Sequence, residues 1–244
     1  MISLPHLVFV LLLFGQHSQT RVDSSADEHA KPSTGEIRGR VTISSAREAM
    51  DDRMHANMLG RYVGHGMDES SFLVVPPEAT KYTLSERAVV YLEGNDLDQQ
   101  KYPIPSRNPA LDQKNLQFHP QVLPVLVGTT VDFPNRDNLF HNVFSYSEAK
   151  DFDLGRYPKD DSRSVTFDRP GVVRVYCDIH SNMSATILVL RHPYFAVPDN
   201  NGDYVIRDVP PGRYRIVLWY DRDAAEHRSV EVPADSTVQV DFIY

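Results

Sequence analysis

Residues 173–183 read Val173-Arg174-Val175-Tyr176-Cys177-Asp178-Ile179-His180-Ser181-Asn182-Met183, and they include the only cysteine of the 244-residue chain. A histidine lies three positions after this cysteine, and a methionine lies three positions after the histidine. A thiolate, an imidazole and a thioether are soft to borderline donors, and with one more imidazole they form the donor set that electron-transfer copper prefers. The stretch therefore predicts a copper site.

The residues around this cysteine predict two neighbouring strands. Before Cys177 the side chains alternate with a period of two, so Val173, Val175 and Cys177 are expected on one face, directed toward a core. A short loop over 178–183 is followed by the apolar run 185–190, which predicts a second strand. The two strands would present three donor side chains around one point.

The missing imidazole is expected on a neighbouring strand upstream, where His141 stands in Leu139-Phe140-His141-Asn142-Val143-Phe144. Over roughly residues 115–190 the chain resembles the cupredoxin family, the small blue copper proteins of the plastocyanin and amicyanin type. The matching runs are Gly128-Thr129-Thr130-Val131-Asp132-Phe133-Pro134-Asn135, His141-Asn142-Val143, and Gly171-Val172-Val173-Arg174-Val175-Tyr176-Cys177 with His180 and Met183.

The resemblance implies a Greek-key β-sandwich that binds one copper ion. It makes His141, Cys177 and His180 the equatorial ligands and Met183 the axial ligand. It gives Asn142 a supporting role, in which this residue ties the histidine strand to the cysteine loop. The spacing on either side of His180 is similar to the short ligand loop of amicyanin. The resemblance also places the edge of His180 at the surface, as the exit for the electron.

This ligand set predicts an electron carrier and not an enzyme. A catalytic metal needs an open coordination position, whereas three strong ligands and a weak axial one, buried in apolar strands, leave none. The sequence also lacks His-Glu-x-x-His, Gly-x-Ser-x-Gly and Walker motifs. We expect an exported, mononuclear type 1 (blue) copper protein that carries single electrons between redox protein partners. A copper trafficking or storage protein and a structural β-sandwich interaction module are the alternatives.

Charge and the N-terminal residues bear on partners and localisation. Acidic residues outnumber basic ones by 33 to 25, so no nucleic acid or anionic membrane surface is expected as a partner. The apolar run 7–14 is too short to span a bilayer but typical of a signal peptide core. We predict a signal peptide over 1–26, with cleavage after Thr20 as the alternative, and a periplasmic or secreted protein. An unpaired cysteine in an exported protein favours a metal ligand.

A second β-sandwich is predicted outside the copper domain. Residues 199–219 resemble the carboxypeptidase-regulatory, or transthyretin-like, sandwich through the turn Asp199-Asn200-Asn201-Gly202 and the run Val209-Pro210-Pro211-Gly212-x-Tyr214. Such modules usually open with a Gly-x-Val strand, a place that Gly39-Arg40-Val41 would fill. We therefore predict one sandwich from 36–94 plus 192–244, with the cupredoxin domain 98–191 inserted into it. Two consecutive domains, or a cupredoxin with long extensions, are the alternatives.

Three further expectations concern local structure. One short helix is predicted near 46–59, where Met50, Met54 and Met58 recur at four-residue spacing. Together with the nearby histidines, these methionines could form an auxiliary copper-loading site in the segment 50–67, and a packing face of the helix is the alternative. The charged residues 151–163, with Gly155 and Pro158, predict a loop. Near the C-terminus, period-two alternation predicts strands whose inward faces carry Tyr214, Ile216, Leu218 and Tyr220, and Val238, Val240, Phe242 and Tyr244.

Overall fold

The computed structural model describes residues 33–47, 49–50, 82–94 and 97–244, and the structural statements below concern these residues. The predicted signal peptide over 1–26 lies outside them, as does most of the Met/His segment 50–67. Of the helix predicted near 46–59, residues 46–47 and 49–50 are helical, and the rest lies outside the described residues. No helix in the described ranges is long and apolar enough to cross a membrane.

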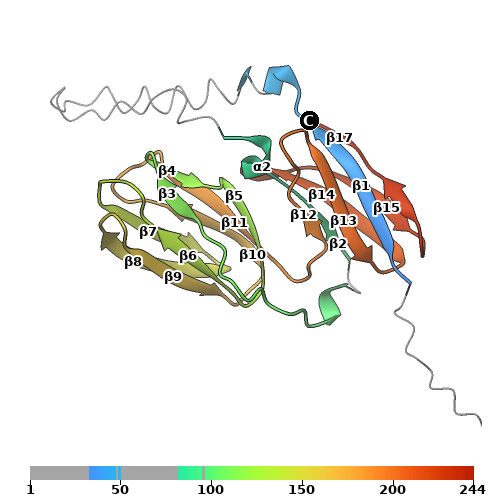
Figure 1. The fold of residues 1–244 in the computed structure, drawn as a ribbon, viewed down its shortest axis with the longest axis horizontal. Helices are drawn as coiled ribbons and strands as arrows, with labels where there is room; N and C mark the ends of the chain where they lie inside the picture. Colours follow the sequence, from blue (N-terminus) through green and yellow to red (C-terminus); the bar gives the residue numbers. More distant parts are fainter. Residues whose placement is uncertain (1–32, 48, 51–81, 95–96) are drawn as a thin grey trace, which may run out of the picture. The chain divides into compact units, whose positions relative to one another are not determined.

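Almost all the secondary-structure elements in the described residues are β-strands, which confirms the predicted all-β class (Figure 1). One group of strands comes from the middle of the chain and forms three sheets. The largest has five strands in the order β5-β11-β10-β7-β8, and the other two are the strand pairs β3-β4 and β6-β9. The members of this group are β3 (Asp112–Lys114), β4 (Gln117–His119), β5 (Val122–Leu126), β6 (Thr129–Pro134), β7 (His141–Ser147), β8 (Lys150–Tyr157), β9 (Ser162–Phe167), β10 (Gly171–Tyr176) and β11 (Ser184–Leu190).

A second group combines the first two strands with the last six. This group forms two four-stranded sheets. The first has the order β13-β1-β16, with β17 also paired to β1, and the second has the order β12-β2-β14-β15. The members are β1 (Gly35–Thr42), β2 (Ala88–Glu93), β12 (Phe195–Ala196), β13 (Asp203–Val209), β14 (Gly212–Tyr220), β15 (Asp223–Val232), β16 (Thr237–Gln239) and β17 (Phe242–Ile243). The short helices α2 (Leu84–Arg87) and η3 (Leu97–Gln99) flank β2 in the sequence.

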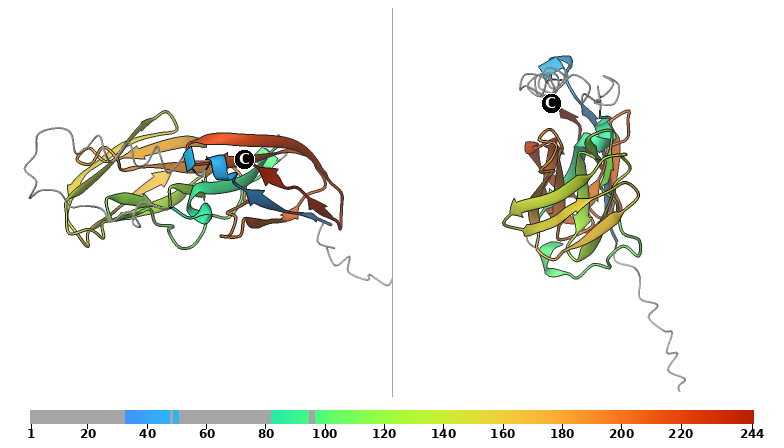
Figure 2. Two further views of the ribbon diagram at one scale, coloured as in Figure 1. Left: turned by 90° about the horizontal axis from the view of Figure 1, so that it is seen from above. Right: turned by 90° about the vertical axis from the view of Figure 1, so that its left-hand side faces the viewer.

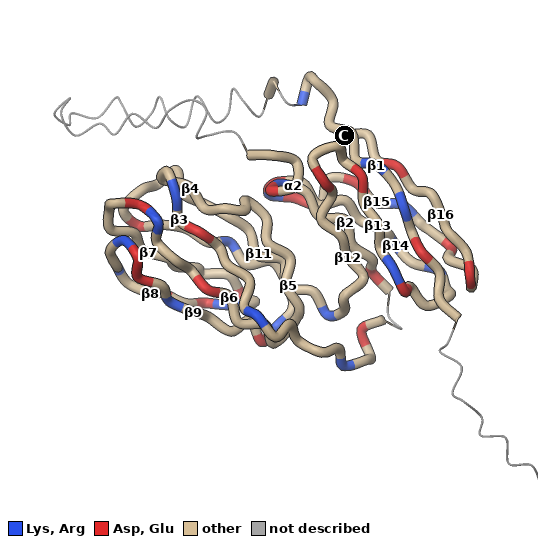
Figure 3. The backbone as a smooth tube through the Cα atoms, viewed as in Figure 1, with Lys and Arg blue, Asp and Glu red and all other residues tan. Residues whose placement is uncertain are grey.

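Each group of strands encloses its own apolar core. Figure 2 shows the strands from two further directions. The core of the middle group includes Val173, Val175 and Cys177, so the strand before the cysteine directs its apolar face inward as predicted. The other core contains the four predicted inward residues of β14. Lys, Arg, Asp and Glu are interspersed along the strands of both groups (Figure 3).

A third, smaller cluster joins the two groups of strands. It consists of Val89 on β2, Trp219 on β14, Val122 on β5 and Leu188 on β11, all of them buried. Arg174 on β10 adds a polar contact, because its guanidinium lies 5.5 Å from the centre of the Trp219 ring. The described residues between 33 and 244 belong to one compact unit.

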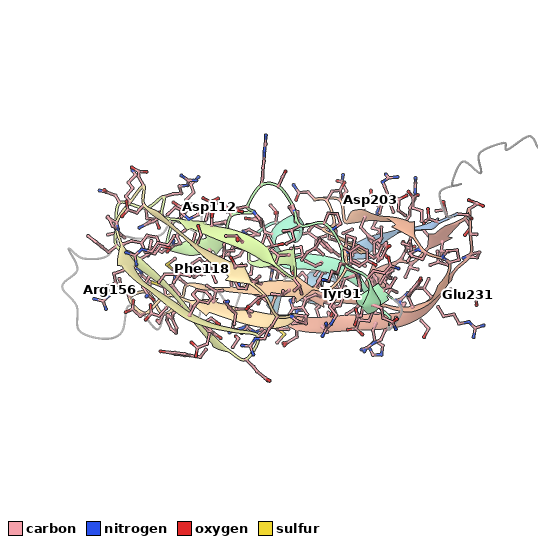
Figure 4. All side chains as sticks on the ribbon, turned by 90° about the horizontal axis from the view of Figure 1, so that it is seen from below. Tyr91, Asp112, Phe118, Arg156, Asp203 and Glu231 are labelled. Carbon is pink, nitrogen blue, oxygen red and sulfur yellow. The ribbon has the colours of Figure 1, made fainter. Side chains whose placement is uncertain are left out.

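The loop predicted for 151–163 is wrong, because most of this segment forms β8 and β9. Phe152 and Leu154 alternate with charged residues and pack against the core, so a half-buried strand tolerates the charges on its other face. The sequence analysis also did not identify β15, which pairs along the whole of β14. Its residues are mostly exposed, and one of them, Glu231, is labelled in Figure 4.

Candidate metal centre

Cys177 directly follows β10 and is 4% exposed, in the core of the middle group of strands. The loop 178–183 then turns the chain into β11, which pairs with β10 from Tyr176 opposite Ser184 onward. Two main-chain hydrogen bonds close this loop: Cys177 N–H donates to the Met183 carbonyl at 3.3 Å, and Met183 N–H donates to the His180 carbonyl at 3.0 Å. Cys177 and His180 are thereby held on a short, hydrogen-bonded turn.

His141 is the first residue of β7, which pairs with β10 through Phe144 opposite Tyr176. This pairing places a fully buried imidazole beside the cysteine loop. The potential ligand atoms of His141, Cys177 and His180 all lie within 4.8 Å of one another. The two Nδ1 atoms are 3.0 Å apart, and Cys177 Sγ lies 3.8 Å from His180 Nδ1. Three predicted ligands from two distant segments therefore converge on one point.

The electrostatics of the centre favour a thiolate. Burial alone would raise the pKa of Cys177, but hydrogen bonds from His141, His180 and main-chain N–H groups outweigh it and lower the pKa to about 5. Burial would likewise lower the pKa of His141, but its contacts with Asp137 and Cys177 raise it to about 9. The thiolate is the form of cysteine that binds metals, and one sulfur with two imidazole nitrogens is a donor set that suits copper.

Met183 lies at the end of the same loop and is 1% exposed. It belongs to the same core cluster as Cys177, so its side chain is packed in the interior near the cysteine strand. Its assignment as the axial ligand stays a prediction.

Asn142, next to His141, is buried and has partners on both sides. Its side-chain oxygen accepts a hydrogen bond from Asp178 N–H in the cysteine loop at 3.3 Å. Its side-chain amide donates to the Asp153 carboxylate on β8 at 2.7 Å. The first contact links the histidine strand to the cysteine loop, and the supporting role of Asn142 at the metal centre stays a prediction.

The sequence analysis did not identify Asp137, which contacts the outer nitrogen of His141. Its Oδ2 lies 2.9 Å from His141 Nε2, on the side of the ring away from His180. The available signal was a carboxylate four residues before the histidine, in a turn that follows β6. Such a spacing is common in loops that hold no metal, so the pattern alone carried little weight.

The family comparison agrees with this geometry. Residues 107–190 match the family described as copper binding proteins, plastocyanin/azurin family. The matched segment contains every residue of the centre, so this part of the chain is similar to the copper-binding cupredoxins, and copper is the cofactor that its His/Cys/His group fits. No curated protein matches the chain.

Similar solved structures include several copper proteins. The copper-containing nitrite reductase of Thermus scotoductus SA-01 is 24% identical, with a TM-score of 0.33, over 37% of this chain and 25% of that chain. A mutant of amicyanin in the Cu(I) form is 19% identical, with a TM-score of 0.33, over 41% of this chain and 98% of that chain. A purple cupredoxin from Nitrosopumilus maritimus is 29% identical, with a TM-score of 0.27, over 29% of this chain and 79% of that chain. The chain thus spans a quarter of the nitrite reductase.

Proposed function

We propose that His141, Cys177, His180 and Met183 bind one copper ion, and that the protein is an exported carrier of single electrons between redox partners. The observation that carries this proposal is the convergence of one thiolate sulfur and two imidazole nitrogens within 4.8 Å, with a buried methionine ending the same loop. Two imidazoles, a thiolate and a weak thioether are the ligands of electron-transfer copper.

The ligand residues favour electron transfer over catalysis. Four side-chain donors would leave no open position for a substrate. Bound copper supplies a one-electron couple between Cu(I) and Cu(II). The strands β7, β10 and β11 hold the donors in a packed core, so the ligands can keep nearly the same positions in both states. In the part of the chain that the structure describes, this is the only group of three or more such metal-binding side chains.

His180 is the ligand through which we propose that the electron leaves. His141 and Cys177 are buried, whereas His180 is only half-buried, so its ring is the part of the centre nearest to a docking partner. Phe140, which precedes the buried ligand on β7, is 58% exposed and offers an apolar contact for that partner. Export rests on the apolar run 7–14 of the sequence.

The arrangement of strands supports a domain proposal. We propose that 36–94 plus 192–244 form one transthyretin-like sandwich and that the copper domain, 98–191, is inserted into it. Both early strands, β1 and β2, pair only with strands after residue 192, and every pairing of β3 to β11 stays within the middle group.

The metal assignment is tested by visible absorption and electron paramagnetic resonance of the purified protein with copper. The wild type should show the intense thiolate-to-copper band, and Cys177→Ser should lose it, because only a sulfur donor produces it. His141→Ala should alter the spectrum by opening a position for external ligands, whereas His227→Ala, at an exposed position of β15, should not. A full blue band in Cys177→Ser would refute the ligand assignment.

A further inference from the structure

The carboxylate of Asp137 receives three hydrogen bonds. His141 Nε2 lies 2.9 Å from Oδ2, the main-chain nitrogen of Leu116 lies 2.9 Å from the same oxygen, and that of Asn115 lies 2.7 Å from Oδ1. The Asp137 side chain is 13% exposed and the His141 side chain is fully buried, so little water competes for these contacts.

The position of this carboxylate is set by structure on both sides. Asn115 and Leu116 form the two-residue turn between β3 and β4, with φ angles of 56° and 59°. This left-handed conformation is unfavourable for Leu, and here it accompanies two N–H groups that donate to one carboxylate. On the other side, Asp137 N–H donates to the side-chain oxygen of Asn135 at 2.9 Å, and Asn135 Nδ2 donates to the Leu139 carbonyl at 2.8 Å.

The same turn also contacts the ligand loop, since Asn182 Nδ2 lies 3.4 Å from the Leu116 carbonyl. The hairpin, the Asp137 carboxylate and the two histidine segments therefore form one connected hydrogen-bond network. A carboxylate held in this way keeps its place when the charge of the centre changes.

The outer hydrogen bond has consequences for the inner face of the imidazole. If Nε2–H of His141 donates to Asp137, the lone pair of the neutral ring is on Nδ1, which is the atom that faces His180 at 3.0 Å. A carboxylate partner orients a ligating histidine and increases its basicity. Its negative charge, largely shielded from water, also interacts more favourably with Cu(II) than with Cu(I).

We propose that Asp137 is a positioning residue that fixes His141 with Nδ1 toward the metal and selectively strengthens Cu(II) binding, so that it lowers the reduction potential. This inference rests on the copper function proposed above. It adds a residue, and a direction of tuning, that the ligand set alone does not provide.

The test compares Asp137→Asn with Asp151→Asn. Both changes remove one negative charge. Asp151, however, is exposed and lies on β8 opposite Tyr146, whereas His141 is at the other end of β7. Asp137→Asn should weaken Cu(II) binding about 10–100-fold and Cu(I) binding less, so the potential should rise by about 59 mV for each tenfold difference. Asp151→Asn should change neither, and Asp137→Glu, which keeps the charge, should lie closer to the wild type than Asp137→Asn.

A second measurement needs no copper. Nitrogen NMR of the metal-free protein, at a pH where His141 is neutral, should show the Nε2–H tautomer in the wild type and a mixture in Asp137→Asn. The inference is overturned if Asp137→Asn keeps the wild-type potential, as the Asp151→Asn control should, or if Asp137→Asn weakens Cu(I) and Cu(II) binding equally, as a merely structural role would. It is also overturned if the tautomer is unchanged. A wild type without a blue band would instead refute the copper function, whatever the NMR result.

Discussion

At the scale of single residues, the centre combines a thiol whose pKa lies below its usual value with an imidazole whose pKa lies above its usual value. The pKa of Cys177 is lowered to about 5 and that of His141 is raised to about 9. Near neutral pH the metal-free protein therefore holds a thiolate beside an imidazolium. Copper can bind the thiolate directly, but it has to displace the proton of His141.

This proton predicts how copper affinity depends on pH. Between about pH 7.5 and 8.5, binding one copper should release one proton from His141, so the apparent affinity should rise about tenfold per pH unit. The rise should level off above the His141 pKa of about 9. Competition for Cu(I) with a chelator, corrected for the chelator's own protonation, measures the slope. An affinity that is constant between these pH values would show that His141 is already neutral there.

Met183 gives a prediction about the reduction potential. A weak thioether contact contributes little to holding the metal, but it biases the two oxidation states. Met183→Leu removes a donor that helps Cu(II) more than Cu(I), so the potential should rise; Met183→Gln supplies a harder oxygen donor, so it should fall. We expect shifts on the order of 59 mV, a tenfold change in the one-electron equilibrium. Voltammetry measures them, with Met50→Leu, at a methionine that is 54% exposed, as the control. Three identical potentials would show that Met183 does not face the copper.

At the scale of the elements, β1 makes an unusually close contact with the C-terminal segment at Gly39. A Cβ atom on Gly39 would lie 1.7 Å from the Val240 carbonyl oxygen, which also accepts a hydrogen bond from Tyr204 at 2.6 Å. Val240 N–H donates to the Arg38 carbonyl at 2.8 Å, so the backbones are already joined. A side chain at Gly39 would therefore have to push the two segments apart.

Gly39→Ala should accordingly reduce the free energy of unfolding by about 1–3 kcal/mol, the usual cost of overpacking. Urea unfolding followed by circular dichroism measures it. Thr42→Ala, at an exposed position of the same strand, is the control and should change stability by less than about 0.5 kcal/mol. If Gly39→Ala were as stable as the control, the close approach of Val240 would not exist in solution.

At the scale of the whole molecule, Trp219 connects the two cores. It is 6% exposed in the small cluster with Val89, Val122 and Leu188, and its indole N–H donates to the Asp221 carbonyl at 3.0 Å. Truncating so large a buried side chain should cost about 3–5 kcal/mol. Because the residue lies on β14, most of that loss should fall on the sandwich formed by the chain ends.

Trp219→Ala is therefore expected to separate two unfolding transitions. In the copper-loaded wild type, the blue absorption band and the far-ultraviolet dichroism should decrease together on heating. In the variant, part of the dichroism should be lost at a lower temperature, while the blue band persists until the copper domain unfolds. Trp219→Phe, which keeps most of the apolar surface, is the control. Coincident transitions in Trp219→Ala would contradict the proposed division into two domains.

The sequence by itself determined the all-β class, the inward face of the cysteine strand and the segment that contains the metal centre. These features depend on local spacing: period-two alternation before Cys177, a tight loop to His180 and Met183, and an apolar run after it. Local spacing is retained in any fold that buries the apolar face. The same rule also locates the inward side of β14, where alternate residues reach the core.

Only the tertiary structure decided how His141 meets Cys177 and which group contacts its outer nitrogen. The Asp137 carboxylate is held by N–H groups from a turn more than 20 residues upstream, through bonds to Asn115 and Leu116, and no sequence spacing specifies such a contact. The cluster around Trp219 likewise joins four strands that are distant along the chain. Long-range contacts of this kind follow from how sheets pack on one another, because packing, unlike periodicity, depends on all the strands at once.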